Sequence, residues 1–272
     1  MSENQSTQWI IGLVVFAAVA AGAYWFWSAD KTEAPPKAVI EEPAPEPEPM
    51  PEIAAPPPPE PAPVPEPEKG PPPALNESDE AAYRDLMSLA PDGALAKWLV
   101  PDEVVRKWVA AVNAASRGEL IHKHRPLKTI KGPIAITEAG PTGIELSPEN
   151  YRRYDQAVRL FSMMDTDTAV EIYRYWYPRL AQAYAELGIR NKNFHQEVME
   201  AIDKVLAAPA AEEPIQLVRP SVYYKFADPE LEKLPGLHKL MIRMGPDNAA
   251  RVKEKLRELK AALEQIPLQQ SE

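Results

Sequence analysis

Cysteine is absent from this 272-residue sequence. Its absence excludes disulfides, cysteine-ligated zinc, iron–sulfur clusters, thiol catalysis and an anchor made by cysteine lipidation. The sequence also lacks the serine-hydrolase, phosphate-loop, dinucleotide-binding and zinc-protease fingerprints. We therefore expect no cofactor and no metal, and we favour a protein that is not an enzyme.

An excess of basic residues is missing too, and the formal net charge is −10. Residues 1–75 hold 11 acidic and 3 basic side chains, a charge of −8, which leaves −2 for the rest of the chain. Domains that bind nucleic acid usually present a strongly basic patch. We therefore expect no nucleic-acid partner.

One long hydrophobic run is present, at residues 9–27, and it reads WIIGLVVFAAVAAGAYWFW without a charge. As a helix, these 19 residues span ~28 Å, close to the ~30 Å hydrocarbon core of a bilayer. Aromatic residues at both ends of the run suit the two membrane interfaces. We predict a short tail at 1–8 and a single transmembrane helix at 9–27, which anchors the protein in a bacterial inner membrane.

Two questions about this hydrophobic segment have alternative answers: whether it is cleaved, and on which side of the membrane the domain lies. Ala21-Gly22-Ala23 offers small residues for signal-peptide cleavage, but residues 1–8 lack the Lys or Arg with which signal peptides usually begin. Lys31 and Lys37 follow the segment, and the positive-inside rule then favours a cytoplasmic domain. We nevertheless favour the periplasmic side, because a long stiff spacer is more useful within a cell envelope.

A proline-rich stretch follows the hydrophobic run. Of the 32 prolines, 18 lie between Pro35 and Pro73, mostly among Glu and Ala. Such a composition offers too few apolar residues to offset the entropy of folding, and proline favours extended polyproline II. We predict a disordered linker at 28–75 that acts as a spacer, with a reach of ~120 Å if fully extended. Alternatively, its PxxP-like runs are ligands for a proline-reading groove.

Residues 76–266 are predicted to form one mainly α-helical domain of seven or eight helices, followed by a tail at 267–272. Apolar residues recur at helical spacing after caps such as Ser78, Ser147 and Asp165. A small β-hairpin is expected from residues 134–146, where two extended stretches flank a glycine-containing turn. Residues 215–226 look extended, but Pro220 makes them irregular or an edge.

The last helix carries an apolar stripe through Val252, Leu256 and Leu263. We expect Lys253 and Lys255 on its outer faces, away from the core.

The densest cationic cluster is His122-Lys123-His124-Arg125. Alternate histidines share one face of a strand, so an anion or a metal could bind there. A solvated basic loop is the favoured interpretation, ahead of anion binding and then of metal binding. Arg152 and Arg153 are further candidates for an anionic ligand, unless they pair with Asp or Glu.

Two other groups of residues have a structural and a chemical interpretation. Tyr173, Tyr175, Trp176 and Tyr177, with Arg174 and Arg179, could form an aromatic platform for a sugar or a peptide. Helical spacing instead favours core packing of a stripe made by Tyr173, Tyr177, Leu180 and Tyr184. The pairs Asp165/Asp167 and Asp228/Glu230 could hydrolyse glycans, but each stands where a helix should begin. Helix capping explains these carboxylates better.

Three runs carry a resemblance to a known family: Tyr151-Arg-Arg-Tyr-Asp155, Leu217-Val-Arg-Pro220 leading into Phe226-Ala-Asp-Pro-Glu-Leu231, and Met244-Gly-Pro-Asp-Asn-Ala-Ala-Arg-Val-Lys253. Together they resemble the bacterial domain of unknown function 3014, over residues 76–263. The resemblance implies an N-terminal hydrophobic segment, a variable low-complexity linker and a Gram-negative source. It implies no activity and no catalytic residue.

These features favour a membrane-anchored envelope protein whose domain acts as a binding or scaffolding module on a stalk. Its partner would be an envelope protein or a cell-wall component. One alternative is an enzyme acting on envelope glycan or lipid, with the carboxylates above and His195 as candidate groups. The other is a self-assembling structural protein, in which the apolar stripe of the last helix packs between copies.

Overall fold

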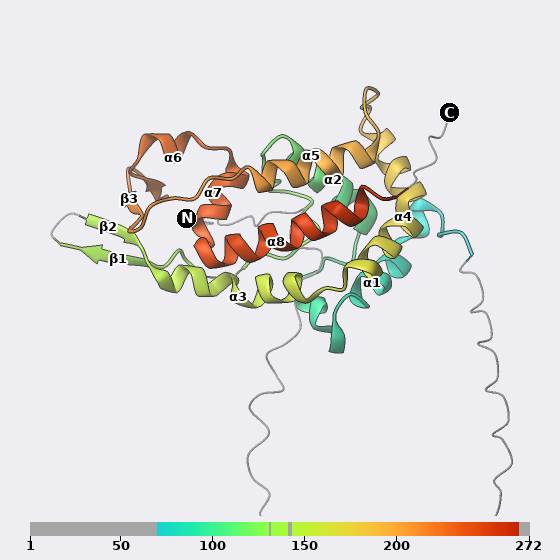
Figure 1. The fold of residues 1–272 in the computed structure, drawn as a ribbon, viewed down its shortest axis with the longest axis horizontal. Coiled ribbons are helices and arrows are strands. Elements are labelled where there is room, and N and C mark those ends of the chain that lie inside the picture. The colour runs from blue at the N-terminus through green and yellow to red at the C-terminus, as the bar shows by residue number, and fades with distance from the viewer. Residues whose placement is uncertain (1–69, 131, 141–142, 267–272) are drawn as a thin grey trace, which may run out of the picture. The chain divides into compact units, whose positions relative to one another are not determined.

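The computed structural model describes residues 70–130, 132–140 and 143–266 (Figure 1). The predicted transmembrane helix at 9–27, both predicted tails and nearly all of the predicted linker lie outside the described residues. Within the described ranges, no helix is long and apolar enough to cross a membrane.

The described part of the chain is mainly α-helical, with eight α-helices and two short 3-10 helices, which confirms the predicted class. The helices are η1 (Leu75–Glu77), α1 (Asp79–Met87), η2 (Pro91–Lys97), α2 (Val104–Ser116), α3 (Pro148–Met163), α4 (Thr166–Glu186), α5 (Phe194–Leu206), α6 (Pro229–Lys233), α7 (Gly236–Arg243) and α8 (Pro246–Leu263).

Side-chain caps start several of these helices where the sequence predicts. Ser147 accepts a hydrogen bond from the Glu149 amide at the start of α3. Asp165 and Asp228 do the same for α4 and α6, accepting from Thr168 N and Glu230 N at 2.8 Å each. The capping interpretation of these two carboxylates is therefore confirmed. Each cap satisfies an amide that the first turn of a helix leaves unpaired.

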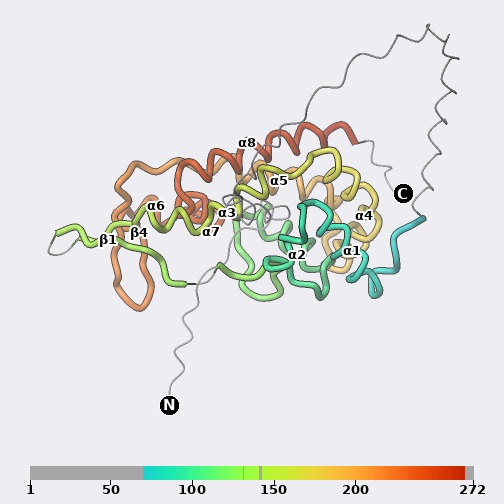
Figure 2. Tube along the Cα trace, turned by 90° about the horizontal axis from the view of Figure 1, so that it is seen from below, coloured from blue at the N-terminus to red at the C-terminus, as the bar shows by residue number. Residues whose placement is uncertain are grey.

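The main core lies between α2, α3, α4, α5 and α8. α2 packs along α5, and α8 packs against α3, α4 and α5; both views follow α8 across the domain (Figures 1 and 2). Val109 on α2 and Val252 on α8 have no exposed surface, and Phe161 on α3 has 1 %. Burying apolar side chains of this size stabilises the fold by about 1.5–3 kcal/mol each.

The burial of Lys255 corrects the prediction that it lies on an outer face of the last helix. Only 5 % of the residue is exposed. Its Nζ donates to Thr166 Oγ1 at 2.7 Å and pairs with Glu258 on its own helix. The prediction failed because four helices, α3, α4, α5 and α7, pack around α8, so more than its apolar stripe is covered.

The β structure is a four-stranded antiparallel sheet rather than a single hairpin. Its strands are β1 (Ile136–Ala139), β2 (Gly143–Leu146), β3 (Gln216–Val218) and β4 (Lys225–Phe226), in that order. The predicted hairpin is present as β1 and β2. Leu217 in β3 pairs with Ile144 on one side and Phe226 on the other, and Pro220 lies in the loop after β3. This sheet packs over a second, smaller apolar cluster that includes Ile242 of α7.

The compact unit begins at Pro72, four residues before the predicted boundary at 76. Arg179 on α4 donates from Nε to the Pro73 carbonyl at 2.6 Å and from Nη2 to the Pro72 carbonyl at 2.9 Å. Leu75 is buried, with 5 % exposed. The end of the proline-rich stretch therefore belongs to the folded domain.

Candidate functional site

The predicted basic cluster lies in the loop that follows α2. His122, Lys123 and His124 are exposed there, and Arg125 is half-buried. This agrees with the favoured interpretation, a solvated basic loop. The alternative in which the two histidines share a strand face does not apply, because His124 has φ +54°, outside the range of strand residues. Among the described residues, no group of three or more His, Cys, Asp or Glu side chains could hold a metal ion.

Arg152 and Arg153 lie on α3 and have protein partners. Arg152 is exposed and pairs with Glu149 one turn earlier, at 2.8 Å. Arg153 donates to Asn150 Oδ1 at 2.9 Å and to the Gly132 carbonyl at 2.8 Å. These contacts tie α3 to the segment before β1, which is a structural use of Arg153.

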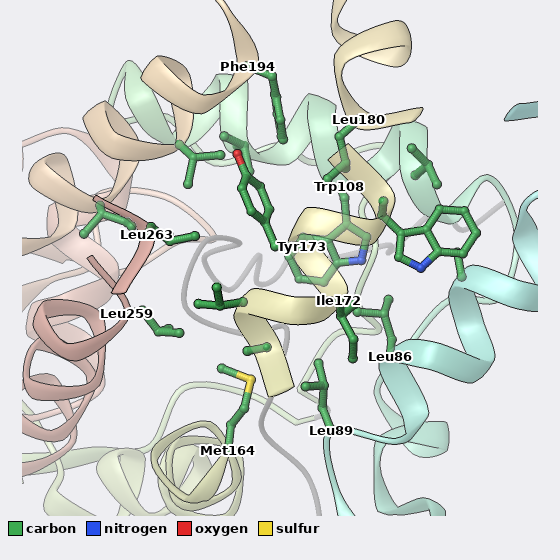
Figure 3. A pocket seen from close by; sticks show the side chains of 18 of the residues that line it. Leu86, Leu89, Trp108, Met164, Ile172, Tyr173, Leu180, Phe194, Leu259 and Leu263 are labelled. Carbon is green, nitrogen blue, oxygen red and sulfur yellow. The ribbon is translucent and has the colours of Figure 1, made fainter. Parts of the chain in front are cut away.

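An apolar cavity of ≈ 190 Å³ lies among the helices of the core and opens to the surface on one side (Figure 3). Six helices contribute to its wall: α1, α2, α3, α4, α5 and α8. Figure 3 shows the wall passing from Leu259 and Leu263 of α8, across Tyr173 and Trp108, to Leu86 and Leu89 at the end of α1.

Aromatic residues on this wall direct their polar atoms to protein partners. Trp176 Nε1 donates to Asp85 Oδ2 at 2.9 Å, and Tyr173 OH lies 3.1 Å from His195 Nδ1. Burial raises the pKa of the Tyr173 hydroxyl and lowers the pKa of His195 below 6.5. A neutral His195 can therefore accept from Tyr173, and the wall presents mainly hydrocarbon to the cavity.

Trp108 also lines the wall, but unlike Trp176 and Tyr173 its polar atom has no protein partner among the described residues. This atom, Nε1, is buried. A buried donor without a partner costs about 1–3 kcal/mol.

The cavity also leaves apolar side chains without close packing partners. Its lining residues Leu86, Leu89 and Leu259 are partly exposed, so the cavity opens to solvent on one side. A guest that fills it would remove apolar surface from water, which contributes about 25 cal/mol per Å². An engineered apolar cavity of about 150 Å³ stays dry and binds benzene. The space is therefore suited to an apolar guest.

The aromatic stretch of α4 gave the only sequence signal for this site. Tyr184 is buried, and Tyr173, Tyr177 and Leu180 pack against the core, which confirms the core-packing interpretation. Trp176 is buried as well. Tyr173 and Trp176 also line the cavity. The other wall residues are ordinary apolar residues of helical stripes, and nothing in their local sequence distinguishes them from a filled core.

Two of the three runs that carry the family resemblance, those at 151–155 and 244–253, meet at the crossing of α3 and α8. Asn248 Nδ2 donates to the Tyr151 carbonyl at 3.1 Å, to Asp155 Oδ1 at 2.9 Å and to the Met244 carbonyl at 3.0 Å. Asn248 is 3 % exposed, so these bonds lie within the protein. Two further depressions of ≈ 270 and ≈ 290 Å³ adjoin this crossing and share Glu213, Gly245 and Pro246.

The fold and the cavity define a mainly α-helical domain with a small antiparallel sheet at one side and an apolar space within its helices. A family model described as "Protein of unknown function (DUF3014)" matches residues 104–260, more than half of the chain. The chain belongs to this family. No curated protein and no solved structure matches the chain. The matched residues begin at α2 and include most of α8, so they cover five of the six helices around the cavity.

Proposed function

We propose that this protein is a membrane-tethered, non-enzymatic binding module whose helical domain takes up an apolar molecule in the ≈ 190 Å³ cavity. The cavity carries the proposal, because its wall offers hydrocarbon surface and aromatic faces. Its tyrosine hydroxyl and one of its two indole N–H groups already have protein partners. Such a wall favours binding through the hydrophobic effect over catalysis, which needs reactive groups at the bound molecule.

The tether is the second part of the proposal. Residues 9–27 would hold the protein in a bacterial inner membrane, and residues 28–71 would separate the domain from it on the periplasmic side. The apolar run and the proline-rich composition support this arrangement. A binding module on such a spacer can meet a ligand or an envelope partner at a distance from its membrane.

Thermal unfolding of the full chain with and without benzene tests the binding site. Because a ligand that binds only the folded state raises the unfolding temperature, benzene near saturation should raise the Tm by about 2–4 °C. The variant Ala169→Phe places a ring at a cavity-lining position and should lose this response. No benzene-dependent rise in the wild type would contradict the proposed site.

A C-terminal alkaline phosphatase fusion tests the compartment, since the enzyme becomes active only after export. Activity is expected, and an inactive but stable fusion would place the domain on the cytoplasmic side. Crosslinking in cells then tests for an envelope partner: recovery of none under several conditions would leave the apolar molecule as the ligand.

A further inference from the structure

We propose that the cavity takes a single unbranched hydrocarbon chain, such as the acyl chain of a lipid or fatty acid. The inference rests on the proposed function, because it names the ligand class of that same site. It commits to a flexible chain, whereas a compact apolar molecule would satisfy the proposed function equally well.

The spread of the wall over the fold favours a hydrocarbon chain as the guest. Residues from six helices line the cavity. Figure 3 shows Leu259 and Leu263 on one side of the cavity, with Leu86 and Leu89 on the other. A long guest can contact both groups, and a flexible hydrocarbon chain can adapt to the wall between them.

The exposure of the wall residues provides a way in. Leu86, Leu89 and Leu259 are partly exposed, whereas Phe161 and Leu256 are 1 % exposed. The cavity therefore runs from the surface into the core. A chain can enter with its methyl end, while a polar group at its other end stays in water. An amphiphile needs this arrangement, because burying its head group without partners is costly.

The wall chemistry also matches a chain better than a polar ligand. Apolar aliphatic and aromatic residues make up the lining, and Glu, Asp, Lys, Arg and His are absent from it across the described residues. Each methylene transferred from water into such a space contributes about 0.8 kcal/mol. Affinity should therefore grow with chain length until the cavity is full, and then level off.

Contact quenching of tryptophan tests this inference in the full chain held in phosphatidylcholine nanodiscs. The probe is a fatty acid brominated in mid-chain, since bromine quenches indole fluorescence on contact. Trp108 and Trp176 line the cavity and Trp98 does not. We expect a saturable quenching component that Trp108→Phe reduces and Trp98→Phe leaves unchanged. An excess of the unbrominated fatty acid should abolish this saturable component by competing for the cavity.

The filled-cavity variant Ala169→Phe should weaken the saturable component by about tenfold or more. If that variant does not fold, competition between benzene and the brominated chain in the wild type decides instead. Quenching that is unsaturable and equal in all variants reports only chains dissolved in the bilayer and overturns the inference.

Different results would contradict the acyl-chain inference and the proposed function. If benzene raises the Tm and saturable quenching is absent, the cavity binds compact molecules, and only the acyl-chain inference is contradicted. If benzene has no effect and saturable quenching is absent, both are contradicted. Saturable quenching that Ala169→Phe leaves unchanged places the chain elsewhere and overturns the inference as well.

Discussion

At the scale of single residues, Glu197 on α5 is a carboxylate enclosed by donors from α2 and α4. Asn113 donates to it at 3.0 Å and Tyr184 at 2.8 Å, and Ser116 donates as well. Lys192 Nζ lies 3.8 Å away. Burial works to raise the pKa of Glu197, but these hydrogen bonds outweigh it and hold the pKa below 4.5.

Replacing Glu197 with Gln should therefore destabilise the domain by about 1–3 kcal/mol, since the charge is lost where buried donors converge. Because the folded-state pKa is lowered, the stabilisation is present above the unfolded value and is lost as pH falls through the folded value. Urea unfolding at neutral and acidic pH measures both effects. Glu200→Gln, one turn away and exposed, is the matched control and should change stability by less than about 0.5 kcal/mol.

His195 predicts a pH effect of its own. Its pKa lies below 6.5 because burial disfavours the charged ring. The unfolded chain then binds the proton more readily, so stability is complete above pH ~6.5 and falls as pH drops toward the folded pKa. His195→Asn should flatten this part of the stability profile. Tyr173→Phe removes only the hydroxyl partner and should retain the slope; if it flattens the profile equally, burial is not the cause.

At the scale of elements, α2 begins with a cap from a distant helix. Asp79 at the start of α1 accepts from the amides of Glu103 and Val104, both at 2.8 Å. Asp79→Ala should cost about 1–2 kcal/mol, the usual effect of a lost N-cap. Its neighbour Glu80 is exposed and pairs with Arg84 on the same helix, so Glu80→Ala should be nearly neutral in the same denaturant titration. Equal effects would refute the capping role.

The junction of α7 and α8 depends on Gly245. It has φ +86°, and a Cβ there would lie 2.5 Å from Cγ of Tyr151 on α3. Gly188 has a similar φ, +76°, with nothing within 4 Å of the corresponding position. Gly188→Ala should cost roughly 1 kcal/mol for backbone strain alone. Gly245→Ala adds a clash with the packed ring of Tyr151 and should cost roughly 3 kcal/mol. If thermal unfolding shows the same loss of stability for Gly245→Ala as for Gly188→Ala, the ring of Tyr151 can move aside without cost.

Local signals explain which elements could be predicted from the sequence. Ser147 and Asp165 precede apolar residues at helical spacing, and such a cap acts within one turn. Asp79 caps a helix 24 residues away, so no short pattern reveals it. The pairing of β2 with β3 joins segments about 70 residues apart. The burial of Lys255 depends on helices distant in the sequence, such as α4, whose Thr166 accepts from it.

The cavity could not be predicted from the sequence, because it too depends on contacts between distant segments. Leu86 and Leu263 belong to apolar stripes that predict a packed interior, and their spacing is the same whether the interior is filled or hollow. Its volume depends on how six helices meet. Of the aromatic residues that the sequence offers for a binding platform, Tyr173 and Trp176 line the cavity, whereas Tyr175 and Tyr177 do not.

At the scale of the whole molecule, the folded domain should be thermodynamically independent of the chain before Gly70. Its packing begins at Pro72, and residues 72–266 contain both apolar clusters. A protein that starts at Gly70 should unfold at the same urea concentration as the full chain. Most of the acidic excess lies before Gly70. The two proteins are therefore compared at high salt, where long-range repulsion is screened.

A protein that starts at Asp79 should be less stable by about 2–4 kcal/mol. It lacks Leu75, whose burial contributes about 1.5–3 kcal/mol, and it leaves Arg179 without the two proline carbonyls. Arg179→Ala in the longer protein should reproduce only part of this loss, since Leu75 stays in place. If starting at Asp79 had no effect, the last prolines would belong to the spacer, and the proposed stalk would extend to the start of α1.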